Sequence, residues 1–204
     1  MHIPKYNQVT DWQEIAAFIR ENSFGILVNV AAGTPLATHI PIELEERGDG
    51  SHVLTGHIAK ANPQWEAFTN GPTLVIFTAP HAYISSSWYE KETIPTWNYI
   101  AVHVYGQIRL LTEDELRASL ARLMDRYEAA SAQPVSLQDV PQQHLENNLR
   151  AIVGFELSIT DVQARFKLSQ NKHEQDYNSI ITHLRERSDE GSHKIAGEMA
   201  KRKK

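Results

Sequence analysis

Cysteine is absent from the 204 residues of this chain. Its absence excludes disulfide bridges, thiolate nucleophiles, and zinc or iron–sulfur centres that need cysteine ligands. Long apolar runs are also missing, so no segment is predicted to cross a bilayer. Lys5, Asp11 and Glu14 lie where a secretory signal would need a continuous apolar stretch, and we therefore expect a cytoplasmic protein.

Positive charge is scarce as well. Lysine and arginine number 20 against 25 aspartate and glutamate, which gives a net charge of −5. Proteins that bind nucleic acid usually carry a basic face, so this balance disfavours a large DNA-binding surface and leaves room only for a local patch.

The common catalytic and metal-binding motifs are missing too. Neither HExxH nor GxSxG occurs, and the ten histidines fit no standard ligand spacing. We therefore expect no metal site and no side-chain nucleophile, and the sequence identifies no catalytic acid or base. No histidine stands out as an axial ligand for haem.

Six segments show the alternating or compact apolar pattern of β-strands. They are joined by tight turns or by single helices, and the first half lacks the strand–helix alternation of a doubly wound sheet. The pattern favours a mainly β chain with helices (α+β), built on a six-stranded antiparallel barrel. The predicted strands are residues 24–30, 36–44, 51–57, 73–78, 97–110 and 153–159.

Helices are predicted between and after these strands. Capping boxes at residues 10–13 and 112–115 begin two of them, and Asn62 followed by Pro63 begins a short one. A last helix begins near Glu174.

We expect one domain over residues 1–204. Within it, residues from about 160 to 204 form a helical C-terminal extension that ends in the basic tail 201–204.

Aromatic and hydroxyl side chains concentrate between residues 54 and 105. This stretch holds three of the four tryptophans, at 65, 88 and 97, together with a run of three serines. A pocket that stacks a flat ring and holds a phosphate needs this combination, because stacking requires aromatic rings and phosphate requires hydroxyl, lysine and backbone N–H donors. The stretch is therefore the predicted binding region.

The strand around Thr38, His39 and Ile40 is a candidate ring-binding edge. Pro41 cannot donate a hydrogen bond to a neighbouring strand, so one side of this strand is expected to be unpaired near it. Free backbone groups there could bind the edge of a heterocycle. An edge strand that proline protects from aggregation is an equal alternative.

Lys60 lies two residues before Asn62, the expected helix cap, and three residues after His57. An ammonium and a helix N-terminus could face the same phosphate, and His57 could add a donor. The alternative is a solvated surface lysine beside an ordinary helix cap.

Two further groups complete the candidate site. Ser86 belongs to a serine run that could supply hydroxyls, and Trp88 follows it as a possible aromatic lid, although such runs are often flexible turns. Asn98 is expected to make a polar contact with a ligand, whereas Trp97 is better suited to the core or an interface.

Four motifs resemble one known family. They are GHIAKANPQW (56–65), AYISSSWY (82–89), PTWNYIAVHVYG (95–106) and FKLSQNK (166–172). They resemble the flavin-binding PaiB family of transcriptional regulators, part of the split-barrel flavoproteins that include pyridoxamine phosphate oxidases. The resemblance covers nearly the whole chain.

This resemblance implies a split-barrel homodimer with FMN at the subunit interface, and negative control of transcription. It implies that Lys60 contacts the flavin phosphate and that Lys167, Gln170 and Lys172 close over the site. Promoter DNA is a further implied partner, with 174–187 as a conceivable contact helix, although a packed amphipathic helix is the simpler interpretation. The alternative function is an FMN-dependent oxidoreductase that acts on a small substrate.

Overall fold

The computed structural model describes residues 1–91 and 94–202. The chain forms two compact units. Unit 1 comprises Met1–Phe18, Phe77–His103 and Gln163–Lys204, and unit 2 comprises Ile19–Ile76 and Val104–Val162. Strands β7 (Thr96–Leu110) and β8 (Ile152–Lys167) pass from one unit into the other.

Eight strands hydrogen-bond in the order β1-β8-β4-β3-β2-β5-β7-β6, and β8 also pairs with β7. The last pairing closes a ring of six strands, β8, β4, β3, β2, β5 and β7. The antiparallel split barrel predicted from the sequence is therefore confirmed. Bounds of the remaining strands are β1 Gln8–Val9, β2 Phe24–Ala31, β3 Thr34–Glu46, β4 His52–Ala59, β5 Thr73–Thr78 and β6 Ala82–Ile84.

The six predicted strands correspond to the six strands of the ring, but the predicted total was too low. Two short strands, β1 and β6, extend the sheet beyond the ring. Two or three residues carry too little alternation to be recognised as a strand, and both segments owe their pairing to the long strands β8 and β7.

The helices lie between and after the strands, as expected, but they are more numerous. A short 3₁₀ turn and a further α-helix lie between residues 129 and 150, and a separate helix follows the one that begins at Glu174. The α-helices are α1 Trp12–Glu21, α2 Glu113–Glu128, α3 Gln142–Arg150, α4 Glu174–Glu186 and α5 Glu190–Lys201. The 3₁₀ helices are η1 Lys5–Asn7, η2 Pro63–Ala67, η3 Ser86–Trp88 and η4 Leu137–Asp139.

The two predicted capping boxes differ in outcome. Thr112 and Glu115 form the predicted reciprocal box at the start of α2. At α1, Asp11 accepts a hydrogen bond from the Gln13 N–H at 2.8 Å, so Asp11 takes the capping role that the sequence pattern gave to Thr10. The end of the predicted basic tail, Lys203 and Lys204, lies outside the described residues.

Unit 2 has its core inside the barrel. Phe155 on β8 packs edge-on against Phe68 after η2, with ring centroids 5.3 Å apart. Both side chains are fully buried, together with Leu27 and Ile42 from β2 and β3. This packing brings the turn after β4 against the ends of β2 and β3, which positions the candidate site.

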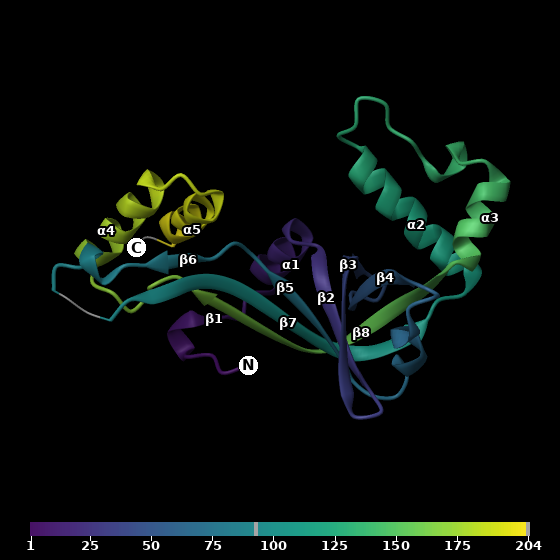
Figure 1. Cartoon of the computed structure of the whole chain (residues 1–204), viewed down its shortest axis with the longest axis horizontal. Helices are drawn as coiled ribbons and strands as arrows, with labels where there is room; N and C mark the ends of the chain where they lie inside the picture. Colours follow the sequence, from purple (N-terminus) through teal and green to yellow (C-terminus); the bar gives the residue numbers. More distant parts are fainter. Residues whose placement is uncertain (92–93, 203–204) are drawn as a thin grey trace. The chain divides into compact units, whose positions relative to one another are not determined.

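Unit 1 is held together by its C-terminal helix pair, the yellow α4 and α5 of Figure 1. The Tyr177 hydroxyl donates to the Met199 carbonyl at 2.8 Å, and Ile180, Leu184 and Ile195 are buried between the helices and the strands of this unit. Among the described residues, no helix is both long and apolar enough to span a membrane.

Candidate cofactor site

Strands β3 and β4 separate at Pro41. Their register runs from Ile42 opposite Gly56 to Glu46 opposite His52, whereas residues 34–41 are in register with β2. Proline has no N–H to donate, which ends the β3–β4 ladder here. A stretch of free strand edge therefore begins at Pro41 and runs back along β3, as the sequence predicted.

Every second residue along this edge presents its backbone outward. The Ile42 N–H donates to the Ser23 carbonyl at 2.8 Å, and backbone groups alternate sides along a strand. Those of Thr38 and Ile40 therefore also face β2, while the N–H and C=O of His39 face the open edge. Of the three predicted residues on this strand, only His39 can bind a ligand through its main chain.

A buried polar cluster fixes the turn beside this edge. Asn62 donates to the Thr38 hydroxyl at 3.0 Å, and that hydroxyl donates to Oε1 of Gln64 at 2.5 Å. Gln64 is only 2% exposed, and its Nε2 donates to the Leu27 carbonyl at 3.1 Å. The structure thus brings predicted residues of β3 and of the turn 60–62 together, and it gives Thr38 a bracing role.

Lys60 has a fixed backbone and an exposed side chain. Its N–H donates to the Ala151 carbonyl at 2.8 Å, and its carbonyl accepts from Nε1 of Trp65 at 3.0 Å. Within residues 1–91 and 94–202, no carboxylate pairs with its ammonium. The anchored main chain keeps this cation at the turn while its head stays available to an anion.

The helix after Lys60 contributes less than the sequence suggested. It is a 3₁₀ turn of five residues, Pro63 has no N–H, and the Gln64 N–H is already bonded to Asn62 at 3.0 Å. A phosphate here would therefore depend on the Lys60 ammonium more than on the helix end.

His57 lies on β4 opposite Gly154 of β8, and its side chain is half-buried. Burial lowers the pKa of its imidazole, because the charged form loses hydration. His57 is therefore neutral near pH 7 and can provide one N–H donor but no positive charge.

The sequence analysis missed Phe24. Its ring is 66% exposed on β2, directly opposite Pro41, and it stacks on His39 with centroids 6.4 Å apart and planes 29° apart. This exposed aromatic pair on the face of β2 and β3 is suited to contact a planar ring. No local signal marked Phe24, because it begins a compact apolar segment and its place beside His39 depends on the β2–β3 register.

Three predicted site residues belong to unit 1. Ser86 lies in η3, which Ser85 caps by accepting from the Ser87 N–H at 3.2 Å. Trp88 stacks on His183 of α4, with centroids 5.1 Å and planes 11° apart. The η3 segment is therefore packed against α4 and is not the flexible turn that serine runs often form.

Asn98 is fully buried on β7. Its Oδ1 accepts from the Ser169 hydroxyl at 3.0 Å, and its Nδ2 lies 3.4 Å from the Met199 sulfur. The side chain thus connects β7 to the loop after β8, so any influence of Asn98 on a ligand passes through Ser169. Trp97, by contrast, is 50% exposed and lies edge-on to His81 and Tyr83.

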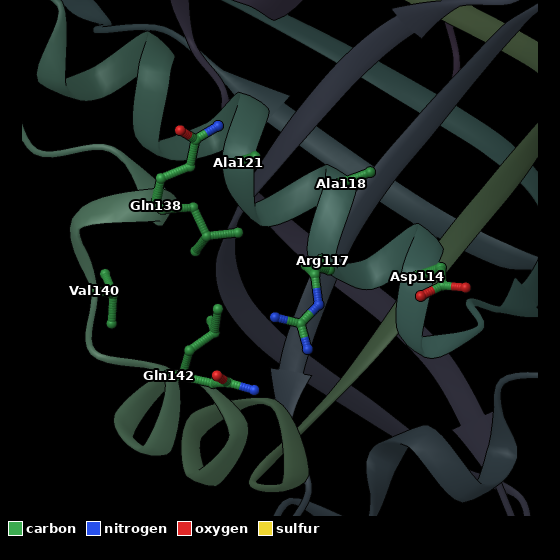
Figure 2. A pocket seen from close by; sticks show the side chains of 9 residues that line it. Asp114, Arg117, Ala118, Ala121, Gln138, Val140 and Gln142 are labelled. Carbon is green, nitrogen blue, oxygen red and sulfur yellow. The ribbon is translucent and has the colours of Figure 1, made fainter.

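Figure 2 shows a pocket in unit 2, framed by α2, η4 and α3. Its volume is about 500 Å³. Arg117 points into it, but this guanidinium lies 3.4 Å from Glu113, and Asp114 belongs to the same lining. The pocket therefore offers no net positive charge and does not suit a flavin phosphate. No cluster of three metal-ligating side chains occurs among the described residues.

Comparison with known proteins gives the family. Residues 1–161 match the family described as "Putative FMN-binding domain". "Protease synthase and sporulation protein PAI 2" of Bacillus subtilis is 44% identical over 197 residues, which cover 96% of this chain and 95% of that protein. An uncharacterised protein of Emericella nidulans is 31% identical over 80% of this chain and 82% of its own length.

Two solved structures share the fold. The flavocytochrome Anf3 from Azotobacter vinelandii superposes with a TM-score of 0.61 at 17% identity, covering 87% of this chain and 78% of that one. The FAD and heme binding protein from Mycobacterium smegmatis superposes with a TM-score of 0.58 at 18% identity, covering 85% of this chain and 80% of that one. At this identity the likeness concerns architecture alone.

Proposed function

The chain belongs to the FMN-binding family of PaiB-like proteins, with FMN as its cofactor, and from this premise we propose that the flavin binds along the open edge of β3. One observation carries the proposal: the β3–β4 ladder ends at Pro41, which leaves the His39 backbone free beside the turn that presents Lys60. When bound, FMN supplies the redox chemistry, and the residues of the chain bind and orient it.

Each element of the edge has a proposed role. The His39 N–H and C=O pair with the polar edge of the isoalloxazine, which carries both acceptors and a donor. Phe24 and the His39 ring cover one of its faces, and Lys60 binds the phosphate. His57 donates one uncharged hydrogen bond. Side chains of Thr38 and Ile40 brace and line the same edge.

Ser86, Trp88 and Asn98 belong to unit 1, and we propose that they act on the flavin held by a second copy of the chain. Ser86 offers a hydroxyl to phosphate or ribityl groups, and Trp88 offers an indole face. Asn98 contributes as a positioning residue through Ser169.

Lys60→Ala tests the phosphate role. We expect FMN affinity to fall roughly tenfold or more, because a charge-assisted hydrogen bond to phosphate is lost. Riboflavin, which lacks the phosphate, should bind both proteins alike. Fluorescence titration of the two flavins measures the difference.

Lys194→Ala is the matched control, since Lys194 is an exposed lysine on α5 that pairs with Glu190 at 2.6 Å. It should leave both affinities unchanged. Equal loss of FMN and riboflavin in Lys60→Ala would show a structural effect and would contradict the phosphate role.

We further propose that the chain is a cytoplasmic homodimer that acts as a negative transcriptional regulator. A regulator must reach promoter DNA, which requires a cytoplasmic location in bacteria. Support for a second copy comes from Trp97 and Tyr83, whose 50% and 40% exposed rings form an aromatic patch. Light scattering should give twice the 23.1 kDa chain mass, and a monomer at micromolar concentration would refute the dimer.

Promoter binding is measured by a gel shift with specific and random DNA at two salt concentrations. Specific binding that weakens with salt supports the regulator. Steady-state NAD(P)H oxidation by the flavin-loaded protein without any DNA binding would instead favour an oxidoreductase.

A further inference from the structure

A second polar pocket lies within unit 1, and neither Lys60 nor any residue of β3 lines it. It is about 300 Å³ in volume, which is at the small end for ligand sites. Segments from η1, from the start of β7 and from the end of β8 surround it. Its lining residues are Tyr6, Asn7, Ile94, Pro95, Thr96, Lys167, Ser169, Asn171 and Lys172.

The charge of this pocket is one-sided. Lys167 and Lys172 both line it, and none of its described lining residues is acidic. The Lys167 ammonium donates to the Thr96 hydroxyl, while the Lys172 ammonium lies 4.0 Å above the Tyr89 ring. Both contacts leave N–H donors for a ligand, since an ammonium has three.

Among residues 1–91 and 94–202, no carboxylate forms an ion pair with Lys167. Partial burial lowers the pKa of its ammonium, and the neighbouring positive charge of Arg165 lowers it further. A bound dianion would relieve both effects at once.

The loop after β8 is held in one conformation around this pocket. Ser169 has a φ of 60°, in the left-handed region that non-glycine residues avoid. Its hydroxyl donates to buried Asn98 at 3.0 Å, and its carbonyl accepts from the Lys172 N–H at 3.0 Å. The Leu168 N–H is bonded to Oε1 of Gln170 at 2.8 Å. The loop therefore presents Lys172 on a fixed backbone.

Asn7 supplies an independent indication of a ligand. Its side chain is 2% exposed, lines the pocket, and has a buried Oδ1 without a hydrogen-bond partner. A buried acceptor without a donor is unfavourable unless a ligand supplies one. A fully ionised phosphate has no hydrogen to donate to the Asn7 Oδ1, whereas a hydroxyl group has one.

We propose that this pocket binds a polyol phosphate, with Lys167, Lys172 and Thr96 on the phosphate and Asn7 on a hydroxyl of the polyol. Two lysines match a dianion, and the unsatisfied amide oxygen matches the alcohol. The ligand is a free sugar phosphate, since the proposed function assigns the FMN phosphate to Lys60, which does not line this pocket.

Calorimetric titration with ribose 5-phosphate, using ribose as the uncharged probe, tests the site. The wild-type protein should bind the phosphate and not ribose. Lys167→Met with Lys172→Met should weaken binding by roughly tenfold to a hundredfold, because two charge-assisted contacts are lost. The same change at Lys194 and Lys201 on α5 is the control and should have no effect. Absence of wild-type binding at millimolar concentration, or unchanged binding by the double variant, overturns the proposal.

Repeating the titration on FMN-saturated protein tests whether this pocket is separate from the flavin site. Retained ribose 5-phosphate binding identifies a separate ligand. Competition by FMN, with a double variant that loses affinity for FMN but not for riboflavin, would place the FMN phosphate in this pocket and overturn the proposal of a separate ligand. If the protein binds no flavin at all, the proposed function fails while the ribose 5-phosphate result still decides this site.

A milder variant guards against misfolding. Thr96→Val removes one hydroxyl with little change of shape and should weaken ribose 5-phosphate binding several-fold. Its circular dichroism and melting temperature should match the wild type, and undiminished binding in a correctly folded Thr96→Val protein would remove Thr96 from the site.

Discussion

At the residue scale, buried amides hold the loops on which the proposed sites depend. Gln64, 2% exposed, bonds to the Leu27 carbonyl and accepts from Thr38, which fixes the turn that carries Lys60. Asn98, fully buried, accepts from Ser169. Satisfied buried polar groups specify one arrangement, because any alternative would leave them unpaired. These amides therefore position the groups that we propose to bind ligands.

Gly106 lies where strands β7 and β8 approach each other closely. A Cβ at this position would lie 2.3 Å from both the Leu157 Cδ2 and the Ser158 carbonyl oxygen of β8. Strand β7 is continuous through this position, over Thr96–Leu110. The glycine is needed for contact with β8 rather than for an irregular backbone.

Gly106→Ala should therefore lower the free energy of unfolding by about 1–3 kcal/mol, the usual range for overpacking. Urea denaturation followed by circular dichroism measures it. Gly48→Ala is the control, because an added Cβ at Gly48 meets nothing within 4 Å. Equal stability of Gly106→Ala and Gly48→Ala would mean that β7 and β8 are less tightly packed than described.

At the scale of elements, the start of α2 combines a cap with an ion-pair network. The Thr112 N–H donates to Glu115 at 2.8 Å, and Arg109 bonds the same carboxylate through two nitrogens at 2.8 and 2.9 Å. Arg109 also donates to Glu156 at 2.9 Å. The helix is thus fixed to β7 and β8 at its first turn.

This network predicts a defined acid sensitivity. Hydrogen bonds from Arg109, then from Thr112, lower the pKa of Glu115 from 4.5 to about 2. A lowered folded-state pKa stabilises the fold above pH 4.5, and that stabilisation is lost as the pH falls towards 2. The stability difference between wild type and Glu115→Gln should therefore shrink over this interval, as measured by thermal unfolding.

Glu113 provides the comparison. Its side chain is 74% exposed, and it pairs only loosely with Arg117, at 3.4 Å. Glu113→Gln should give a small, nearly constant stability difference over the same interval. If the stability difference for Glu115→Gln were also independent of pH, the hydrogen bonds from Arg109 and Thr112 to the Glu115 carboxylate would be contradicted.

At the scale of the whole molecule, two long strands connect the two units covalently. β7 and β8 each contribute residues to both, so neither unit has a complete set of strands of its own. We therefore propose that residues 1–204 form one folding domain, as the sequence predicted.

One cooperative unfolding transition should follow from this arrangement. Urea midpoints from far-ultraviolet circular dichroism and from tryptophan fluorescence should coincide. A Trp65→Phe variant confines the fluorescence signal to unit 1, which contains Trp12, Trp88 and Trp97. Two separated midpoints in this variant would show that the units unfold independently.

Local sequence signals determined several features. The six long strands follow from their apolar periodicity, and the α2 cap follows from Thr112 and Glu115, since each depends on residues close in sequence. The end of the β3–β4 ladder followed from Pro41 alone, because proline lacks an N–H wherever it is placed. Four motifs were sufficient to identify the FMN-binding family.

Only the tertiary structure decided which side chains meet across long sequence separations. It placed Phe24 beside His39 and Asn7 beside the lysines of the β8 loop, and it buried Asn98, which the sequence had taken for a ligand contact. Strands β1 and β6 likewise depend on partners many residues away. Periodicity in the sequence predicts which face of a strand is apolar. Which residues pack against that face depends on how the closed sheet and its helices are assembled.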